Sequence, residues 1–552
     1  MSASAARAPG AGLGARMAAA ALGAGGLVTL AAGAAGLVEP KVAAGLVIAA
    51  AAGAIGHRWI LQWHRLVGLL VVVILFIPIR RYGFVGDLPF QLEPYRVLVA
   101  VVLGAWIASL LVDPAVRLWR SGFEKPMALL VLAVLASVVA NPSRVADTSS
   151  YVTKDLMFLA SFLLLFYAMV SLVRDRRHID TLLKILVGGG VVIAVSTVIE
   201  ARSGYNVFNH LEGWVPGLKL LELPEVPGRG IRLRAYASAQ HPIALSALLV
   251  ILMPPAIYLA HRTRNKAWLG AIAVLFVGVA ATNSRTGIVM LLVVGLVYLW
   301  LRPAETRRLW PALIPGAVAV QLLMPGTLGS LKQSFFPEGG LLKEQSQFAG
   351  WEGSGRIADL WPSLAEWSYQ PLFGQGYGTR ITDPGPDQNA LILDNQWLLT
   401  LLEVGALGFI AWVWLFGGLV RRLGRGARHD QSDRGWLMAA LAASLTAFAV
   451  GMLTYDAFSF VQVTFVAYVL AAMAAVVLDE GTAEAHPVRP REDGRGGRPV
   501  PSLRPVTPRR PSRSAGTGSG RPAPASVATA PIRPVPPHAA QEAPLRRRGD
   551  GR

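Results

Sequence analysis

The chain is built largely from apolar runs about as long as a bilayer is thick, separated by short basic segments. A hydrocarbon core of roughly 30 Å needs about 20 apolar residues per helix. Fourteen such runs can be counted, centred on 17–38, 42–56, 66–79, 97–112, 126–140, 155–173, 180–199, 242–260, 267–282, 286–301, 310–325, 396–420, 436–453 and 458–478. The sequence therefore predicts an all-α polytopic membrane protein with about 14 (12–14) transmembrane helices over residues 17–479.

The first two runs leave the count open. Residues 17–38 follow a short N-terminal segment (1–16) that contains Arg7 and Arg16, and the whole resembles a signal peptide. Because another apolar run follows at once, we expect an uncleaved span instead. The second run, 42–56, is rich in Ala and Gly and could be re-entrant.

Composition excludes several other classes of protein. Only 15% of the residues are charged, against about 25% in a soluble domain, which argues against a soluble enzyme. The chain has no Cys, so disulfides and cysteine-based zinc, iron–sulfur or thiol chemistry are excluded. None of its 9 His falls at HExxH or a similar spacing. The sequence therefore predicts no metal site and no cofactor.

Lys and Arg collect in alternate gaps between the apolar runs, and this bias indicates the orientation of the chain. If the N-terminus is cytoplasmic, every cytoplasmic gap is basic. These gaps hold Arg58 and Arg65; Arg117, Arg120 and Lys125; Arg174, Arg176 and Arg177; Arg262, Arg264 and Lys266; Arg302, Arg307 and Arg308; and Arg421, Arg422, Arg425, Arg428 and Arg434. The sequence thus predicts a multi-pass protein of the cytoplasmic membrane with an even number of spans and both termini in the cytoplasm.

The last segment, 480–552, differs from the rest of the chain. It holds 14 Arg against 6 acids, and 14 of the chain's 37 Pro. This composition is typical of a disordered segment, so we predict a basic, disordered cytoplasmic tail. Because much of the formal net charge of +19 lies there and in the cytoplasmic gaps, the charge does not indicate nucleic-acid binding.

Three longer segments, 80–96, 201–240 and 327–395, fall outside the membrane in this orientation. The third is predicted to be one large extracytoplasmic loop. It contains an amphipathic helical pattern, expected to lie on the outer membrane surface, formed by Ile357, Leu360, Trp361, Leu364 and Trp367. Pro362 would either kink this helix or mark its true start.

Several arginines fall on the predicted outer side, where the charge bias disfavours Lys and Arg. Arg285 is the only charge in the outer turn 283–286. Its guanidinium would suit a bidentate contact with a phosphate, although it could instead snorkel to lipid headgroups. Arg229, Arg232 and Arg234 lie in a net positive loop, which is either simply solvated or part of the same site. His241, just before Pro242, is predicted to start the next helix.

Acids follow in the last third of the chain. Asp394 and Asn395 precede the span at 396–420. Asp394 could cap this helix, act as a base, or do both. Glu403 lies seven residues after Gln396, on the same helix face. An acid at that depth is rare unless it faces the bundle interior or a wet cavity.

Taken in order, these motifs resemble the O-antigen ligase and O-antigen polymerase family over residues 225–415. They are an Arg before an H-P helix start, an S-R-T-G turn, a G-R…W…P-L-F-G-x-G-x-G stretch, and a polar pair opening a span that contains L-x-E-x-G-x-x-G. Members of this family are polytopic inner-membrane glycosyltransferases whose donors are glycans linked to a polyprenyl diphosphate such as undecaprenyl diphosphate. The resemblance implies an enzyme of cell-envelope polysaccharide biosynthesis that needs neither metal nor nucleotide.

The resemblance also implies roles for single residues at the outer face. Arginines would hold the donor diphosphate and stabilise charge on the leaving group, and a carboxylate would orient or deprotonate the acceptor hydroxyl. The predicted site residues are Asp394, Arg285 and Glu403 for catalysis, Arg232, Arg234, Arg285 and Arg356 for the diphosphate, and Asn395, Trp361 and Tyr377 for the glycan. The predicted partners are the lipid-linked donor, a glycan or other hydroxyl acceptor, the bilayer and a chain-length regulator or flippase, but no nucleic acid.

One departure from the family pattern bears on the reaction. Ligases usually have His where this chain has Asp394, in a pattern H-N-x-x-L that here reads D-N-Q-W-L. This favours a polymerase-like member, with transfer of finished glycan to a lipid, protein or wall acceptor as the alternative. A flippase would be expected to line its central cavity with charge and to show internal repetition. A structural scaffold would leave the outer arginines unexplained.

Overall fold

The computed structural model describes residues 63–84, 93–112, 116–223, 234–309, 311, 313–323, 329, 360–380 and 393–485. Seven helices in this part of the chain are long and apolar enough to cross a membrane. They are α4 (Pro94–Val112), α7 (Ser149–Leu172), α8 (Arg176–Ser203), α9 (Pro242–Thr263), α17 (Gln396–His429), α18 (Asp433–Gly451) and α19 (Val461–Ala485). The helical class is confirmed, and the chain is a multi-pass membrane protein.

Shorter helices account for the remaining apolar runs in the described part. They are α3 (Trp63–Phe76), α5 (Glu124–Ala140), α10 (Ala267–Ala281), α11 (Arg285–Leu301) and α13 (Leu313–Leu323). Four further short helices are α6 (Pro142–Asp147), α12 (Pro303–Leu309) and the 3-10 turns η1 (Val207–Asn209) and η2 (Leu211–Gly213). With 11 residues, α13 is too short to cross a bilayer unaided.

Several predictions lie outside the described residues. These are the first two apolar runs, 17–38 and 42–56, most of the loop 327–395, and the tail from residue 486. The count of 14 spans and the large loop therefore stay predictions. The last helix, α19, continues to Ala485, past the predicted end of its span, because its final turns are rich in Ala and Glu, which favour helix.

Two helices form the centre of the packing. On α9, the residues from Ile243 to Ala256 are buried around the whole circumference, because α8, α10, α11, α18 and α19 all pack against it. On α19, nearly every side chain from Val461 to Val477 is buried as well. A helix that is apolar on all sides is expected to occupy such an interior position.

The predicted cytoplasmic gaps meet at one end of the helices. Arg174 forms an ion pair with Asp479, and Arg262 Nη1 lies 3.0 Å from Asp433 Oδ2. Arg176 Nη2 donates to the carbonyl oxygen of Asp433 over 3.2 Å. These contacts join three gaps that are far apart in sequence, as the alternation of basic segments predicts. They show that the gaps share one end of the bundle, which we call the basic end.

At the opposite end, a two-stranded ribbon joins two of the predicted outer segments. Strand β1 (Tyr82–Phe84) pairs antiparallel with β2 (Leu218–Leu220), with Gly83 opposite Lys219. A ribbon of this size is not stable alone, so it depends on the helices beneath it.

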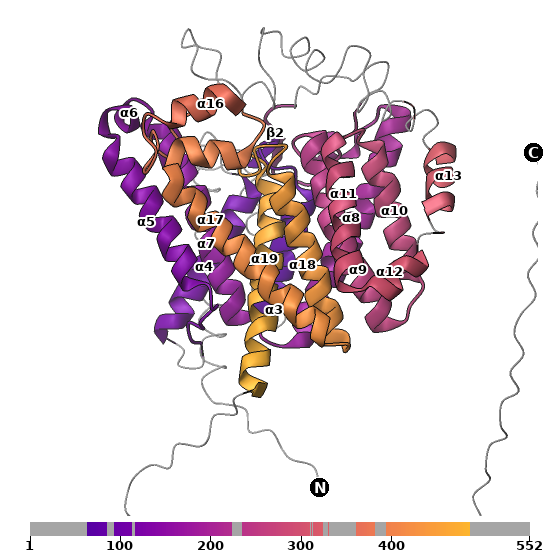
Figure 1. Ribbon diagram of the computed structural model, residues 1–552. Helices are drawn as coiled ribbons and strands as arrows, with labels where there is room; N and C mark the ends of the chain where they lie inside the picture. The colour runs from indigo at the N-terminus through magenta and orange to yellow at the C-terminus, as the bar shows by residue number, and fades with distance from the viewer. Residues whose placement is uncertain are drawn as a thin grey trace, which may run out of the picture. The chain divides into compact units, whose positions relative to one another are not determined.

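Helix α16 (Leu360–Trp367) also lies at this end, across the start of α17 (Figure 1). Pro362 falls in its first turn, so it marks the start of the helix and causes no kink. Leu364 and Trp367 pack against a small core that contains Leu398 and Leu402 of α17, whereas Leu360 and Trp361 are exposed. The expectation that this helix lies on the outer membrane surface stays a prediction.

Candidate functional site

Two of the sequence motifs form one structural unit, which we call the glycine joint (residues 371–378 and 402–407). Gly374, Gly376 and Gly378 have φ values of 66°, 112° and 70°, and Gly405 interrupts α17 with φ 72° and ψ −168°. Residues with a side chain rarely adopt these conformations. The break at Gly405 removes intrahelical partners from α17, so the neighbouring backbone groups can bond to the glycine-rich turn.

Backbone hydrogen bonds run in both directions across the glycine joint. The amides of Ala406 and Leu407 donate to the carbonyls of Pro371 and Leu372 over 2.8 and 3.4 Å. In return, the carbonyl of Leu402 accepts from the amide of Gln375 over 2.9 Å. The P-L-F-G-x-G-x-G and L-x-E-x-G motifs are thus two halves of a single contact, which explains their glycines without invoking a nucleotide-binding loop.

Glu403 lies inside this joint and is 8% exposed. Its carboxyl Oε1 accepts from the amide of Arg380 over 3.4 Å, and its carboxyl group also accepts from the amide of Gly378. Its main-chain carbonyl accepts from Ser137 Oγ of α5 over 2.6 Å. Glu403 therefore holds the 376–380 segment in place. The sequence alone did not reveal this structural role. The catalytic role predicted for Glu403 stays a prediction.

Glu403 and Gln396 both line a small cavity of about 10 Å³, which is otherwise mostly apolar. Tyr377 lines the same cavity, and its hydroxyl donates to the carbonyl oxygen of Asp155 over 3.4 Å. A cavity of this size holds at most about one water molecule. Tyr377 is therefore placed between helices, whereas Trp361 is 76% exposed on α16. The two predicted glycan contacts are not brought together.

The start of α17 requires a correction. Asn395 is the N-cap, because its Oδ1 accepts from the amide of Leu398 over 3.1 Å. The expectation that Asp394 caps the helix is wrong, since the cap position falls one residue later. Asp394 is half-buried just before the cap. Asn395 thus supplies the cap of α17, and the chemical role of Asp394 stays a prediction.

The turn between α18 and α19, residues 452–460, anchors the starts of two other helices. The amide of Gln396 donates to the carbonyl of Met452 over 2.8 Å, and Gln396 Oε1 accepts from the amide of Phe458 over 2.9 Å. Thr454 Oγ1 lies 3.0 Å from Thr286 Oγ1, in the first turn of α11. Since Arg285 directly precedes Thr286, one turn fixes the two helix starts that carry Arg285 and Asp394.

The same turn carries Asp456, which sequence reasoning missed. Asp456 accepts a hydrogen bond from Ser459 Oγ, and its other carboxyl oxygen is buried with no hydrogen-bond partner among the described residues. Burial raises the pKa of Asp456 above its usual range, and the nearby charge of Asp394 acts in the same direction, while Ser459 and Arg80 oppose it. The available signal was a lone acid in an otherwise apolar turn, L-T-Y-D-A-F.

A third carboxylate at this end of the bundle comes from the start of α7. Asp155 lies beside the glycine joint, where a Cβ on Gly378 would come within 3.1 Å of Asp155 Oδ2. Asp155 interacts electrostatically with Asp456 and with the cations Lys154 and Arg80. Arg80 is exposed and has a positive φ of 65°. Acids and bases from four segments therefore share one electrostatic environment at the end of the bundle opposite the basic end.

The described residues 234–241, which include Arg234, are held by two buried charges. Glu200 accepts from the amides of Tyr236 and Ala237 over 3.2 and 2.7 Å. Arg81 donates to the carbonyls of Ala237 and Ala239 over 3.0 and 2.6 Å. Burial lowers the pKa of Arg81 to about 10, so its guanidinium stays charged near pH 7. Neither residue was singled out in the sequence.

The loop ends as the sequence predicts. His241 is the N-cap of α9, and its Nδ1 accepts from the amide of Ile243 over 3.2 Å. Two predicted diphosphate contacts, Arg232 and Arg356, lie outside the described residues. Among the residues that the structure describes, no group of three or more His, Cys, Asp or Glu is placed to hold a metal ion.

Comparison with known proteins bears on the family that the sequence resembles. No curated protein matches the chain. The family model described as O-antigen ligase matches residues 270–413. The matched region contains the S-R-T-G turn, α16, the glycine joint and the start of α17, but neither Arg234 nor Asp456. The match confirms that this chain resembles the O-antigen ligase and polymerase family over residues 270–413.

Proposed function

We propose that the protein is a metal-independent membrane glycosyltransferase that joins polyprenyl-diphosphate-linked oligosaccharide repeat units at the outer face of the cytoplasmic membrane. The observation that carries the proposal is the 452–460 turn, which bonds to the helix starts that carry Arg285 and Asp394. A guanidinium and a carboxylate are thereby fixed at the same end of the bundle, where donor and acceptor have to meet.

The reaction consumes the activated bond of the donor. The acceptor hydroxyl oxygen bonds to the anomeric carbon of the donor sugar, and the bond from that carbon to the diphosphate oxygen breaks. The polyprenyl diphosphate leaves with the bonding electrons, and the hydroxyl proton passes to a carboxylate. Arg285 and Arg234, with Arg232 and Arg356 as further candidates, stabilise the negative charge that develops on the diphosphate.

Asp394 is the proposed proton acceptor. Asn395 already caps α17, so the Asp394 carboxylate is not needed to satisfy that helix. A carboxylate can serve in place of the ligase His, because the step requires a positioned proton acceptor and not an imidazole in particular. Asp456 adds a second carboxylate beside it. Glu403 remains a candidate acceptor, and Asn395, Trp361 and Tyr377 remain candidate glycan contacts.

The proposed topology has both termini in the cytoplasm. The transmembrane domain covers residues 17–479 with an even number of spans, the segment 327–395 is extracytoplasmic, and the segment 480–552 is a cytoplasmic tail. The outer arginines and the glycine joint then face the side at which lipid-linked repeat units are joined. A chain-length regulator or a flippase would act beside the enzyme.

Arg285→Ala in a host that accumulates short lipid-linked repeat units tests the proposal. The wild type should produce a ladder of increasing glycan length on a gel, and Arg285→Ala should produce only unextended units at an equal membrane level. Arg307→Ala is a matched control, because Arg307 is an exposed arginine of α12 outside the site. An unchanged ladder from Arg285→Ala would contradict the proposal that Arg285 binds the donor diphosphate.

The same gel separates the alternatives. A single glycan length moved to a new lipid, protein or wall acceptor would favour the ligase, which is also the activity that the matched family is named for. Unextended units that only change leaflet would favour a transporter and contradict the enzyme.

A further inference from the structure

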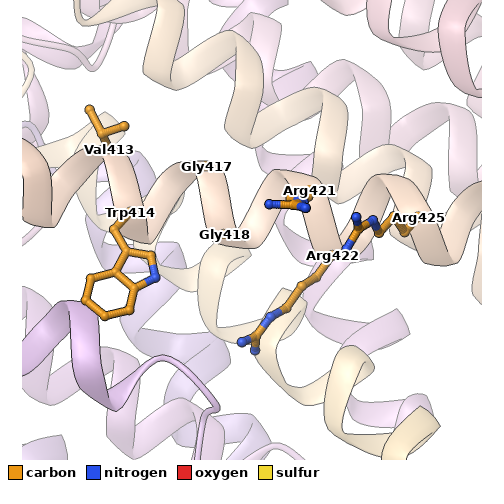
Figure 2. A pocket seen from close by; sticks show the side chains of 7 residues that line it. All are labelled: Val413, Trp414, Gly417, Gly418, Arg421, Arg422 and Arg425. Atoms are coloured by element: carbon orange, nitrogen blue, oxygen red, sulfur yellow. The ribbon is translucent and has the colours of Figure 1, made fainter.

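An open cavity lies on α17, on the C-terminal side of the glycine joint. It is an open groove of about 580 Å³, lined by Val413, Trp414, Gly417, Gly418, Arg421, Arg422 and Arg425. Figure 2 shows Trp414 and Arg422 pointing to the same side of the helix. An adjoining cavity of about 230 Å³ shares Trp414, Gly418 and Arg422 and extends to the start of α5 at Phe123. Both volumes together fall in the range of small-molecule sites.

The end of this groove at Arg421–Arg425 is positively charged. Arg421, Arg422 and Arg425 are all exposed, and none of them forms an ion pair with a carboxylate among the described residues. Arg422 contacts the protein differently, since it donates to the carbonyl of Gly122 over 3.0 Å and its guanidinium lies 4.6 Å from the centre of the Phe123 ring. The positive charge of the groove is thus not neutralised by neighbouring acids of the described chain.

Two other arginines at the basic end are paired with acids of the chain. Arg174 pairs with Asp479, and Arg262 pairs with Asp433. Glu124 is an acid that lines the smaller cavity. Its carboxylate accepts from the amide of Gly122 over 3.1 Å and from Ser121 Oγ over 3.1 Å. Glu124 is therefore bound to its own turn, and within the described part of the chain it forms no ion pair with Arg421, Arg422 or Arg425.

The other end of the groove, at Val413 and Trp414, is apolar and faces away from the bundle. Val413 and Trp414 are each 47% exposed, on a helix that crosses the membrane. A Cβ on Gly417 would meet no atom within 4 Å, so its missing side chain leaves open space at the surface. Twelve residues of helix separate Val413 from Arg425, a rise of about 18 Å. The groove thus runs from hydrocarbon depth to the headgroup level.

We propose that this groove binds an anionic phospholipid from the leaflet at the basic end, which is the cytoplasmic leaflet in the proposed topology. The lipid phosphate lies among Arg421, Arg422 and Arg425, and an acyl chain lies along Gly417 and Gly418 beside Trp414. Charge complementarity selects the occupant, since arginines bind phosphate through charge-assisted hydrogen bonds. The C-terminal segment of the chain does not fit, because residues 480–552 hold 14 Arg against 6 acids and would be repelled.

Tryptophan quenching by brominated lipid tests this site on the purified full-length protein in neutral detergent. Phosphatidylglycerol with brominated acyl chains should quench the fluorescence of Trp414 in a saturable way. The contribution of Trp414 is the difference between the wild type and Trp414→Phe. Arg421→Gln with Arg425→Gln should weaken the binding about thirtyfold, as expected for two arginines at a membrane surface.

Matched variants separate a specific site from general surface charge. Arg307→Gln with Arg308→Gln removes two exposed charges from α12, also at a helix end, and should leave the binding unchanged. Gly417→Leu should fill the groove with all arginines kept and abolish the quenching. Gly295→Leu, at an equally open position of α11, should not.

Three outcomes would overturn the proposal. Brominated phosphatidylcholine could quench Trp414 as strongly as brominated phosphatidylglycerol does, which would mean that the groove does not select an anionic headgroup. The α12 double variant could weaken binding as much as the α17 double variant does. Finally, Gly417→Leu could bind lipid like the wild type, which would leave the groove without a role. None of these results depends on glycan transfer, so the proposal is tested separately from the enzyme activity.

Discussion

The amide nitrogen of Ala406 lies 2.8 Å from the carbonyl oxygen of Pro371, and this hydrogen bond closes the glycine joint. It exists because α17 is broken at Gly405, whose φ of 72° and ψ of −168° leave the helix. The joint connects the described segment 360–380 to the membrane-spanning helix that follows Asp394. Its integrity should therefore matter both for stability and for transfer.

Gly405→Ala should damage this joint. A Cβ at this position would lie 2.3 Å from the carbonyl oxygen of Leu372, and the backbone conformation is costly for any residue with a side chain, by about 1–3 kcal/mol. We expect a lower midpoint of thermal unfolding in detergent and a loss of glycan polymerisation. Gly188→Ala is the control, because a Cβ there meets nothing within 4 Å and Ala favours helix. Equal stability of both variants would contradict the role of the joint.

Arg81 should act as a positioning residue for the loop that carries Arg234. Arg81→Lys keeps the charge but loses the planar fork that reaches the carbonyls of Ala237 and Ala239. We expect a fall in transfer of about tenfold, with a weaker apparent affinity for the donor and a smaller effect on the maximal rate. Steady-state measurement over a range of donor concentrations separates the two parameters.

A control for this prediction is Arg262→Lys, which alters an exposed ion pair with Asp433 at the basic end. It should leave both parameters unchanged, because exposed pairs contribute little. If Arg81→Lys lowers only the amount of folded protein, and the remaining protein binds donor normally, the loop has no positioning role.

The sequence predicted most of the helices and the candidate site at the level of segments. Apolar runs and alternating basic gaps are properties of single segments, so they can be identified without a structure. The start of α9 at His241 and the turn before Arg285 were predictable for the same reason. Asp394 as the cap was one residue off, since Asp and Asn are both good N-caps and only the backbone geometry distinguishes Asn395.

Residues that depend on contacts between distant segments were not predictable. Asp456 belongs to the site because the 452–460 turn bonds to the starts of α11 and α17, and no local pattern reveals this. The same holds for Glu200, which holds residues 236 and 237 through backbone amides. Glu403 was identified as unusual from its depth alone, but its bonds to the amides of Gly378 and Arg380 appear only in three dimensions.

The proposed orientation predicts which ends of the helices are accessible from outside the cell. The chain has no Cys, so single cysteines can be labelled without background. Trp361→Cys, at an exposed position of α16, should react with a membrane-impermeant maleimide on intact spheroplasts. Arg307→Cys, at an exposed position of α12, should react only after permeabilisation. The reverse pattern would invert the topology and move the proposed site to the cytoplasmic face.

The last prediction concerns two acids, Asp394, which precedes α17, and Asp456, which lies in the 452–460 turn. Asp394→Asn should lower transfer by about 10²–10⁴-fold, the usual contribution of a general base. It should leave thermal stability nearly unchanged, because Asn395 supplies the cap of α17. A variant that loses stability and activity together would mean that Asp394 is structural.

Asp456 should give the activity a pH dependence. Its pKa is raised by burial and by the charge of Asp394, so it holds its proton at pH values where an ordinary Asp, with a pKa of about 3.9, has lost it. If the ionised form is needed, transfer rises as the pH rises through this elevated pKa. Folding stability changes in the opposite direction: because the folded state binds the extra proton, stability falls over the same interval.

Two variants check this assignment. Asp456→Asn should remove both the rising limb of the pH–activity profile and the matching fall in stability. Asp394→Asn removes a negative charge that raises the pKa of Asp456, so its stability profile should shift to lower pH. Profiles measured on wild type and both variants in one buffer series decide the point. If Asp456→Asn keeps the wild-type profile in both measurements, the titrating group lies elsewhere and Asp456 serves only to hold its turn.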